Sequence, residues 1–448
     1  MIEPRTLKGF RDFLPEDMEP RERLIDIARD VYRSYGFRPI DTPVLEYLEI
    51  LTGKGSDETD RLMYSFQDHG GRPVGMRFDL TVPLARFVAQ YHQQLGMPFK
   101  RYHIAKVWRG ENTHRGRYRE FMQCDFDTIG TLSIAADTEM VLVIHDLLLK
   151  LGIEKFQIRI NNRKVLNGLL DRLGLAEHAT AVLRSLDKLA KIGPQGVADE
   201  LREHTPAQPD QIAAVLELSQ VGDEPDRIWS TIDRLVGDNA LGQEGAAQLK
   251  DVVQSAQAAG VAPQRLAVDV SIARGLDYYT GTVVETLLDD LPQIGSVCSG
   301  GRYDNLVGAY SNQLLPGVGA SLGLDRLLAA LEELGWANSA PPATPVFVPF
   351  FDAQSLPQYL ALAARIRQAG WGVEVYPEPK RLGQQLKYAD RRGFRVAVIQ
   401  GSDEIAQQTC QVKDLRSGAT EQIDISQSLE ALRGSIERIL AGSTQPAN

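Results

Sequence analysis

The segment that organises the chain is Phe99–Gly130, with the sequence FKRYHIAKVWRGENTHRGRYREFMQCDFDTIG. It predicts two strands, 102–108 and 120–128, that are joined by a charged loop. In the second strand apolar and polar side chains alternate, so one face can pack in a core. The opposite face carries an amide and two carboxylates in a row, which indicates a polar pocket rather than a purely structural strand.

The loop between these two strands is strongly basic. From Lys100 to Arg119, seven Lys and Arg side chains accompany a single acid, Glu111, in a chain whose formal net charge is −10. Planar guanidinium groups suit phosphate or carboxylate better than ammonium groups do. A solvated hairpin loop is the alternative explanation, but we favour a site for a polyanion beside the polar pocket.

The RGE, RGRYREF and QCDFD runs of this segment resemble motif 2 of the class II aminoacyl-tRNA synthetases, in the form found in the histidyl-tRNA synthetase family. The resemblance implies that Arg109 contacts the α-phosphate of ATP. It also implies that Glu111 and Arg117 lie over the adenine and the phosphates. Gln123 and Asp127 are then expected to line the amino-acid pocket.

Length and composition bound the class of protein. With 448 residues, 43% of them hydrophobic, the chain is predicted to form two to four domains of a soluble globular protein. The three cysteines are far apart and form no CxxC motif, which argues against a disulfide framework and a structural zinc site. No apolar signal region or membrane-length apolar run occurs. We therefore expect a cytoplasmic protein that does not span a membrane.

Near the N-terminus a helix is predicted at 20–35, followed by the run FRPIDTPVLEYLEIL. Proline is poorly tolerated inside a central strand, so Pro39 and Pro43 predict an edge or interface element here. The run is similar to motif 1 of the class II family, which implies a homodimer interface around Pro43.

The run GMRFDLTV, residues 75–82, predicts a strand that ends in a polar step, where the chain enters a helix predicted from Val82. Asp79 and Thr81 lie at this step, where side chains and free N–H groups often converge on ligands. A simple helix cap is the alternative interpretation. In the histidyl-tRNA synthetase family the positions that match Asp79, Leu80 and Thr81 help to hold the amino acid.

The most specific local signature is RGLDYY, residues 274–279. An arginine beside tyrosines is often only a cation–π or packing pair, but this run resembles an element specific to histidyl-tRNA synthetases. The resemblance places Arg274 at the α-phosphate and Tyr278 and Tyr279 at the histidine. SGGRYDNL, residues 299–306, is similar to the family's second element and implies that Tyr303 closes the pocket.

The run PGVGASLGLDRLL leads from three glycines into an amphipathic helix. Glycines allow a backbone to approach a ligand closely. Arg326 lies near the start of the helix, where a cation is unfavourable unless an anion binds there. The run resembles motif 3, whose arginine stacks on adenine and meets the γ-phosphate.

The remaining chain is divided by changes in composition. Short Leu- and Ala-rich helical patterns predict a helical insertion at 162–262, and a Pro/Ala/Ser-rich linker follows at 336–345. Alternating strands and helices at 346–448 predict a small, largely parallel α/β domain, which binds the anticodon in the family. Residues 1–161 and 263–335 are then expected to form the catalytic domain.

Together these motifs imply an α+β fold of the class II synthetase type: an antiparallel sheet flanked by helices, a helical insertion and a small C-terminal α/β anticodon-binding domain. The implied activity is the ATP-dependent ligation of L-histidine to tRNA(His) through a histidyl-adenylate. Arg109 and Arg274 are expected to be catalytic, Mg²⁺ is expected to accompany ATP, and no protein-held metal site is expected.

Two alternatives share the fold. One is the regulatory subunit of ATP phosphoribosyltransferase, which senses histidine, typically lacks the C-terminal domain and has lost ATP-site arginines. The other is a class II synthetase for glycine, threonine or proline, which lacks RGLDYY in this setting.

Overall fold

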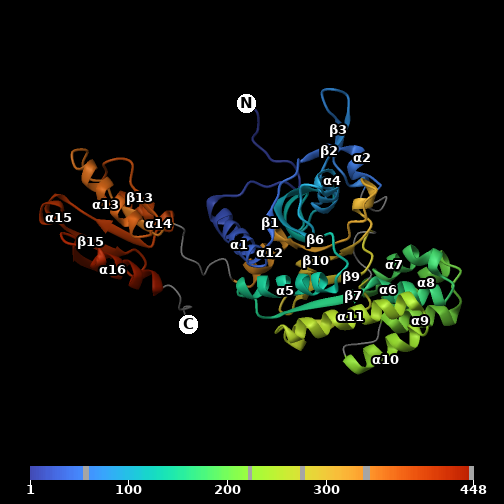
Figure 1. The fold of residues 1–448 in the computed structure, drawn as a ribbon. Helices are drawn as coiled ribbons and strands as arrows, with labels where there is room; N and C mark the ends of the chain where they lie inside the picture. The colour runs from blue at the N-terminus through green and yellow to red at the C-terminus, as the bar shows by residue number, and fades with distance from the viewer. Residues whose placement is uncertain (54–59, 220–223, 273–277, 336–343, 443–448) are drawn as a thin grey trace. The chain divides into compact units, whose positions relative to one another are not determined.

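The computed structural model describes residues 1–53, 60–219, 224–272, 278–335 and 344–442. The chain divides into two compact units, Met1–Ala330 and Leu331–Asn448 (Figure 1). Most of the predicted linker lies outside the described residues. Among the described residues, no helix combines the length and the apolar character that crossing a membrane requires.

The first unit is built on an eight-stranded sheet, counted over the described residues, with the order β1-β5-β6-β11-β10-β9-β7-β8. The strands from β5 to β7 in this order pair antiparallel, whereas the edge strands β1 and β8 pair parallel with their neighbours. The antiparallel sheet that the sequence predicts is therefore confirmed. The bounds are β1 Arg38–Pro39, β5 Phe99–Trp108, β6 Glu120–Ile129, β7 Phe156–Asn162, β8 Leu266–Val268, β9 Thr282–Leu288, β10 Cys298–Tyr303 and β11 Gly317–Gly323.

Helices cover this sheet and create its core. The apolar face of β6 packs on the first helix, where the rings of Tyr32 and Phe126 lie 5.1 Å apart and the Tyr32 hydroxyl donates to the Cys124 carbonyl at 2.9 Å. The opposite face of β6 remains for the polar side chains. The helices are α1 Pro15–Ser34, α4 Thr81–Tyr91, α5 Ile134–Lys150 and α12 Leu324–Glu333.

The first helix begins five residues earlier than the sequence predicts. Pro15 occupies its first turn, where a missing N–H costs nothing and the fixed φ suits a helix. The acidic side chains of Glu16 and Asp17 follow in the same turn and favour the positive end of the helix dipole. Pro20 therefore lies inside the helix rather than at its start.

A separate three-stranded sheet, order β2-β4-β3 among the described residues, lies beside the short helix α2. Both strand pairs are antiparallel. Its elements are β2 Leu45–Tyr47, α2 Leu48–Leu51, β3 Ser65–Gln67 and β4 Pro73–Met76.

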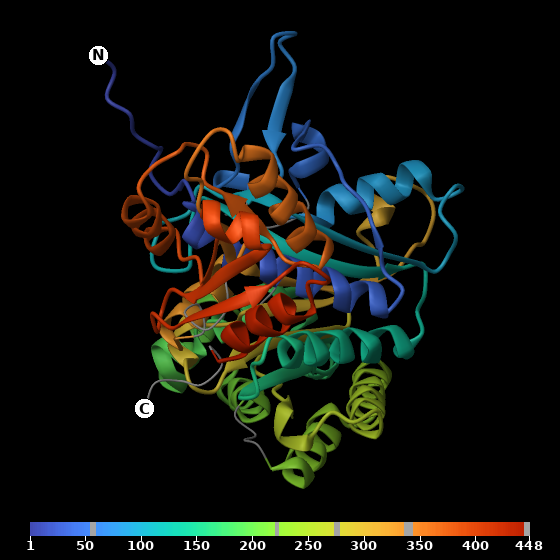
Figure 2. The same ribbon diagram turned by 90° about the vertical axis from the view of Figure 1, so that its left-hand side faces the viewer.

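A helical region follows β7 and packs on the sheet through its last helix, α11, which contacts α5, α6 and β7 (Figures 1 and 2). Glycines allow this close packing, because a Cβ on Gly168 would lie 2.4 Å from the Gly242 Cα. The elements are α6 Arg163–Arg172, η1 Ala176–His178, α7 Ala179–Leu186, α8 Leu189–His204, α9 Pro209–Ser219, α10 Pro225–Val236 and α11 Ala240–Ala258.

The second unit has a five-stranded sheet, counted over the described residues, with the order β13-β12-β14-β15-β16. Its first three strands pair parallel, but β14, β15 and β16 pair antiparallel. The prediction of a largely parallel sheet is therefore wrong for its C-terminal half, because short connections can join only antiparallel neighbours. The elements are β12 Val346–Val348, α13 Leu356–Gln368, β13 Val373–Val375, α14 Leu382–Arg391, β14 Val396–Ile399, α15 Ser402–Gln407, β15 Thr409–Asp414, β16 Thr420–Asp424 and α16 Glu430–Ala441.

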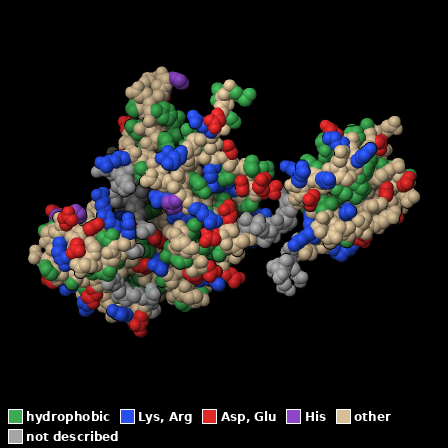
Figure 3. All heavy atoms as spheres, turned by 180° about the vertical axis from the view of Figure 1, so that it is seen from behind, with side chains coloured by type: hydrophobic (Ala, Val, Ile, Leu, Met, Phe, Trp, Pro, Cys, Tyr) green, Lys and Arg blue, Asp and Glu red, His purple; other side chains and the backbone are tan. Residues whose placement is uncertain are grey.

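Basic side chains lie in and beside α14, and two of those beside it are paired with nearby acids. Lys380 pairs with Glu378 at 2.8 Å, and Arg395 pairs with Asp414 at 2.9 Å. In the space-filling view of Figure 3, basic, acidic and hydrophobic side chains are interspersed over the visible face of the unit. That face of the unit is therefore not uniformly positive.

Candidate active site

A pocket of about 210 Å³ opens where β5, β6, β11 and α12 meet. Five of the residues that the sequence predicts for the ATP and histidine sites line it. The lining consists of Arg109, Glu111, Gly116, Arg117, Tyr118, Phe121, Gln123, Ser296, Val297, Ser299, Ser321, Gly323, Asp325 and Arg326.

Arg109 is held in place at the end of β5 by two aromatic rings. Its guanidinium carbon lies 4.4 Å from the centroid of Phe78 and 5.0 Å from that of Phe121. Its Nε donates to the Phe78 carbonyl at 3.0 Å. These contacts fix the plane of the guanidinium fork at the pocket wall, which suits bidentate recognition of an anion.

Three arginines and two acids, Glu111 and Asp325, line the pocket, and Asp325 is already paired with arginines outside the lining. The Arg326 Nη1 donates to the Ser296 carbonyl at 2.6 Å, and Glu111 accepts from Arg117. Burial lowers the pKa of Arg326, and the nearby charges of Arg117 and Arg109 lower it further. Burial alone would raise the pKa of Glu111, but its hydrogen bond to Arg117 and the neighbouring cations give a net lowering. The excess of positive charge fits a polyanionic ligand.

The polar step before α4 is a helix cap in this structure. The Asp79 carboxylate accepts hydrogen bonds from the backbone N–H groups of Thr81 at 3.1 Å and Val82 at 2.9 Å, both to Oδ1. Burial raises the pKa of Asp79. The Leu80 side chain is fully buried in the core, and its carbonyl faces Arg101. Of these three predicted residues, only Asp79 and Thr81 offer polar side chains to a neighbouring site.

The polar face of β6 is anchored by neighbouring strands. Gln123 donates from Nε2 to the Ser321 hydroxyl at 2.8 Å, and Tyr303 donates its hydroxyl hydrogen to Asp127 Oδ1. Gly319 makes room for this arrangement, because a Cβ there would lie 2.3 Å from Asp127 Oδ1. The motif 3 glycines were expected to admit a ligand, whereas Gly319 admits the side chain of a neighbouring strand.

Three tyrosines close the inner end of this cluster. The Tyr278 ring lies 5.0 Å from the Tyr279 ring and 5.8 Å from the Tyr303 ring, both edge to face. The Tyr279 carbonyl accepts from the Arg163 Nη1 at 3.0 Å. Arg274, predicted as catalytic, lies outside the described residues.

The structure thus divides the predicted residues into two adjoining groups. The open pocket contains Arg109, Glu111, Arg117, Gln123 and Arg326. A more buried polar cluster contains Asp79, Thr81, Asp127, Tyr278, Tyr279 and Tyr303. Gln123 joins the two groups, since it lines the pocket and lies two residues before Asp125 and four before Asp127 on the same face of β6.

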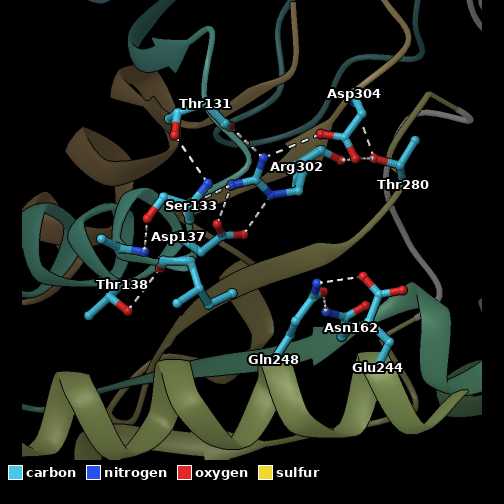
Figure 4. A network of polar contacts seen from close by, with 12 residues as sticks. Thr131, Ser133, Asp137, Thr138, Asn162, Glu244, Gln248, Thr280, Arg302 and Asp304 are labelled. Atoms are coloured by element: carbon cyan, nitrogen blue, oxygen red, sulfur yellow. Dashed lines mark hydrogen bonds and ion pairs between the residues drawn. The ribbon is translucent and has the colours of Figure 1, made fainter. Parts of the chain in front are cut away.

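Tyr303 is positioned by the buried arginine that precedes it. The Arg302 guanidinium donates to Asp137 through Nε at 3.1 Å and through Nη2, and its Nη1 donates to the Thr131 carbonyl at 3.0 Å (Figure 4). This fork ties β10 to the N-terminus of α5. Because side chains alternate along a strand, Arg302 and Tyr303 point to opposite faces of β10.

Sequence reasoning missed Asp325, which holds the back of the pocket together. Its carboxylate accepts from the Arg21 Nη1 at 2.7 Å, from Arg11 and from the Met122 backbone N–H at 2.8 Å. It therefore joins the N-terminal segment, α1, β6 and α12. No local sequence signal could reveal this role of Asp325, because Arg21 and Asp325 are far apart in the chain and meet only in the folded protein. The sequence pattern instead indicates a function for the neighbouring Arg326.

Comparisons with known proteins identify the family. Residues 9–327 match the family model described as histidyl-tRNA synthetase, and residues 346–435 match the anticodon binding domain model. The chain belongs to the histidyl-tRNA synthetase family. A histidine–tRNA ligase from Rhodopirellula baltica is 59% identical over 444 residues, which cover 99% of this chain and 100% of the relative. A histidine–tRNA ligase from Wolinella succinogenes is 44% identical over 437 residues, which cover 97% of this chain and 99% of the relative.

Solved structures agree with this family. The crystal structure of histidyl-tRNA synthetase from Nostoc sp. PCC 7120 is 36% identical, with a TM-score of 0.88 and coverage of 98% of this chain and 100% of that one. A Bacillus halodurans structure described as an ATP phosphoribosyltransferase regulatory subunit/histidyl-tRNA synthetase has a TM-score of 0.74 at 21% identity. It covers 89% and 99% of the two chains and shows the shared fold alone.

Proposed function

We infer that this member of the histidyl-tRNA synthetase family is a histidine–tRNA ligase, which activates L-histidine with ATP and transfers it to tRNA(His). The observation that carries this conclusion is the near-full-length identity to histidine–tRNA ligases, 59% over 444 residues in one case. An arginine-lined pocket beside a buried carboxylate cluster supports it, since the first suits a polyphosphate and the second suits the ammonium and imidazole N–H groups of histidine.

We propose a first step in which the histidine carboxylate attacks the α-phosphate of ATP in line. The bond to the β-phosphate bridging oxygen breaks, so histidyl-adenylate forms and pyrophosphate leaves. No side-chain nucleophile is required, because the carboxylate is already one. In the second step a ribose hydroxyl of the terminal tRNA adenosine attacks the acyl carbon, and AMP leaves.

The protein's part in the first step is to position the reactants and to offset the charge that develops on phosphorus. We assign Arg109 to the α-phosphate, supported by its fixed plane at the pocket wall. Arg274 is proposed as the second cation from its motif alone. Glu111 and Arg117 are assigned to the adenine and phosphates, and Arg326 to adenine stacking and the γ-phosphate, supported by their place in the pocket lining.

Mg²⁺ is proposed to enter with ATP on its outer phosphates. Such ions usually keep several waters and take only one or two carboxylates besides the phosphate oxygens. The two carboxylates of the pocket lining, Glu111 and Asp325, each accept hydrogen bonds from arginines, so phosphate oxygens and waters would supply most of the ligands of such an ion. The ion would neutralise phosphate charge, while the arginines orient the nucleotide.

For histidine we propose that Gln123, Asp127 and Asp79 hold the ammonium and imidazole groups. Thr81, the Leu80 backbone and Tyr278 would complete the walls, while Tyr279 and Tyr303 would close the pocket. The hydrogen bond from Tyr303 to Asp127 supports this assignment, since it presents an oriented acceptor for an imidazole N–H.

We propose that residues 1–161 and 263–335 form the catalytic domain, 162–262 the helical insertion and 346–448 the anticodon-binding domain for tRNA(His). The family match at 346–435 supports the last of these. It also favours a ligase over the histidine-sensing regulatory subunit, which typically lacks this domain. Three buried, unpaired cysteines fit a reducing, cytoplasmic setting.

A homodimer is proposed through the surface around Pro43. Four apolar side chains there are 39–50% exposed in the single chain: Val44, Leu45, Tyr47 and Phe66. Exposed apolar groups of this kind favour a protein partner. Light scattering of the purified protein should give twice the chain mass of 49.6 kDa, and Leu45→Asp should give single chains. A monomeric wild-type protein would refute the proposal.

The activity is tested by ATP–pyrophosphate exchange without tRNA, in the presence of each amino acid in turn. Exchange with histidine only is expected. Well-folded protein that exchanges with none of them would point to a histidine-sensing protein instead. Exchange with glycine, threonine or proline would change the assigned substrate.

Tyr303→Phe is expected to raise the KM for histidine by about tenfold, with little change in the KM for ATP. The variant keeps the ring packing but removes the hydrogen bond that orients Asp127, and a bond to a charged group contributes about 1.5–3 kcal/mol. Exchange kinetics at varied histidine and ATP measure the two KM values. Tyr310→Phe, which removes a hydroxyl bonded to the Ile50 carbonyl, is the matched control. An unchanged histidine KM would separate Tyr303 from the substrate.

A further inference from the structure

A buried cation that no predicted role uses lies beside the proposed histidine pocket. Arg101 is 0% exposed and lies on β5 directly opposite Asp127 on β6. Its Nη2 lies 2.7 Å from Asp127 Oδ2 and 3.4 Å from the Leu80 carbonyl. The Arg101–Asp127 pair is close without a well-directed hydrogen bond, so its attraction is mainly electrostatic.

Three buried carboxylates surround this one guanidinium. Asp79, Asp125 and Asp127 are each at most 5% exposed. Burial raises the pKa of all three, to about 7 for Asp125, while Arg101 lowers the pKa of each. Asp125 also carries an oxygen, Oδ1, that has no hydrogen-bond partner among the described residues.

Besides Arg101, the buried guanidinium of Arg77 interacts with Asp125, and the remaining neighbours add little positive charge. Burial lowers the pKa of His103, opposite Asp125 on β5, to about 3, so this imidazole is neutral near pH 7. The charged and titratable neighbours are Arg77 and Asp79 before α4, Arg101 and His103 on β5, Tyr32 on α1, Tyr279 before β9 and Tyr303 on β10.

We propose that Arg101 is a positioning residue for histidine: it keeps Asp127 an oriented carboxylate, although the neighbouring carboxylates Asp79 and Asp125 repel its charge. The two oxygens of Asp127 have separate partners: the Tyr303 hydroxyl donates to Oδ1, and the Arg101 guanidinium lies beside Oδ2. A carboxylate accepts an N–H, whereas a protonated acid also acts as a donor. This inference rests on the proposed role of Asp127 in histidine binding.

The effect of removing the cation has a defined sign. Without Arg101, burial and the neighbouring carboxylates are expected to raise the pKa of Asp127 further. Histidine would then meet a protonated Asp127 at low pH and a carboxylate at high pH. Its KM should therefore fall as the pH rises, while the KM for ATP, bound in the other group of residues, stays constant.

The experiment measures ATP–pyrophosphate exchange between pH 6.5 and 9 for wild type, R101M, R101K and R101M/D125N. R101M is expected to raise the KM for histidine at pH 7 by about tenfold or more, with the ATP KM within about twofold. R101K, which retains the charge, should recover most of the affinity. R101M/D125N should recover it in part, because it removes the opposing charge.

Lys106→Met is the matched control, since Lys106 lies on the same strand and makes a surface pair with Glu120. Thermal denaturation of each variant checks folding. An unchanged histidine KM in folded R101M, or a rise that is the same at every pH and is not relieved by D125N, overturns the proposal.

If R101M does not fold, the histidine KM of the single variant D125N tests the proposal. D125N should leave the histidine KM equal or lower, with a weaker pH dependence above pH 7, whereas a tenfold rise would overturn the proposal. Wild-type protein that does not exchange with histidine would instead refute the proposed function, so the two failures are distinct.

Discussion

Replacing Arg109 with alanine is expected to lower the rate of histidine-dependent ATP–pyrophosphate exchange by about a thousandfold. The guanidinium is held between Phe78 and Phe121 and by the Phe78 carbonyl, so it is already oriented before the substrate arrives. A preorganised cation in a partly closed pocket stabilises charge that develops on the phosphorus without reorganising. The loss should therefore appear mainly in kcat.

Two further variants sharpen this test. Arg109→Lys keeps the charge but loses the planar fork, so it should recover only part of the rate. Lys106→Ala removes a cation three residues earlier on β5, where an exposed pair contributes little, and should exchange normally. If folded Arg109→Ala exchanged within about threefold of wild type, Arg109 could not be the α-phosphate ligand.

Asp325→Ala is expected to lower the free energy of unfolding by about 3–5 kcal/mol, because it leaves a buried charge without its partner. Arg21 is only 2% exposed, and Asp325 accepts two hydrogen bonds from it at 2.7 and 3.1 Å. The Met122 backbone N–H and Arg11 lose the same acceptor. Denaturant unfolding followed by circular dichroism measures the change.

The matched control is Asp26→Ala on α1, which removes an exposed pair with Arg29. Its unfolding curve should nearly coincide with that of wild type, since surface pairs contribute little. Arg21→Met/Asp325→Leu, which removes both charges, should lose less stability than Asp325→Ala alone. If Asp325→Ala behaved like the surface control, the Arg21–Asp325 contact would not hold α12 against α1 and β6.

Local patterns were sufficient for the parts of the fold that depend on nearby residues. The alternation in residues 120–128 predicts which face of β6 meets α1, and Tyr32 and Phe126 pack there. The confirmed fold class follows from the same motifs. The predicted start of α1 at residue 20 is too late, because Pro15 also suits the first turn of a helix and the helix begins there.

Contacts between distant residues could not be read from the sequence. Arg101 was counted only as part of the basic loop, because nothing in its neighbours reveals that it faces Asp127 across the β5–β6 pair. Asp325 was hidden beside Arg326 for the same reason. The sequence pattern does not predict the antiparallel C-terminal half of the second sheet, because an alternation of strands and helices indicates parallel pairing and gives no sign of β15 and β16.

The pairing of β6 with β11 has a consequence for biosynthesis. These neighbours lie on opposite sides of the helical region in the chain, and α12 with Arg326 follows directly after β11. A nascent chain that ends at residue 316 contains β5 and β6 but lacks β11. Ser321 is then missing from beside the polar face of β6, and β10, which carries Tyr303, lacks the strand that joins it to β6. The pocket and the polar cluster beside it are therefore complete only after the chain through Arg326 has been synthesised.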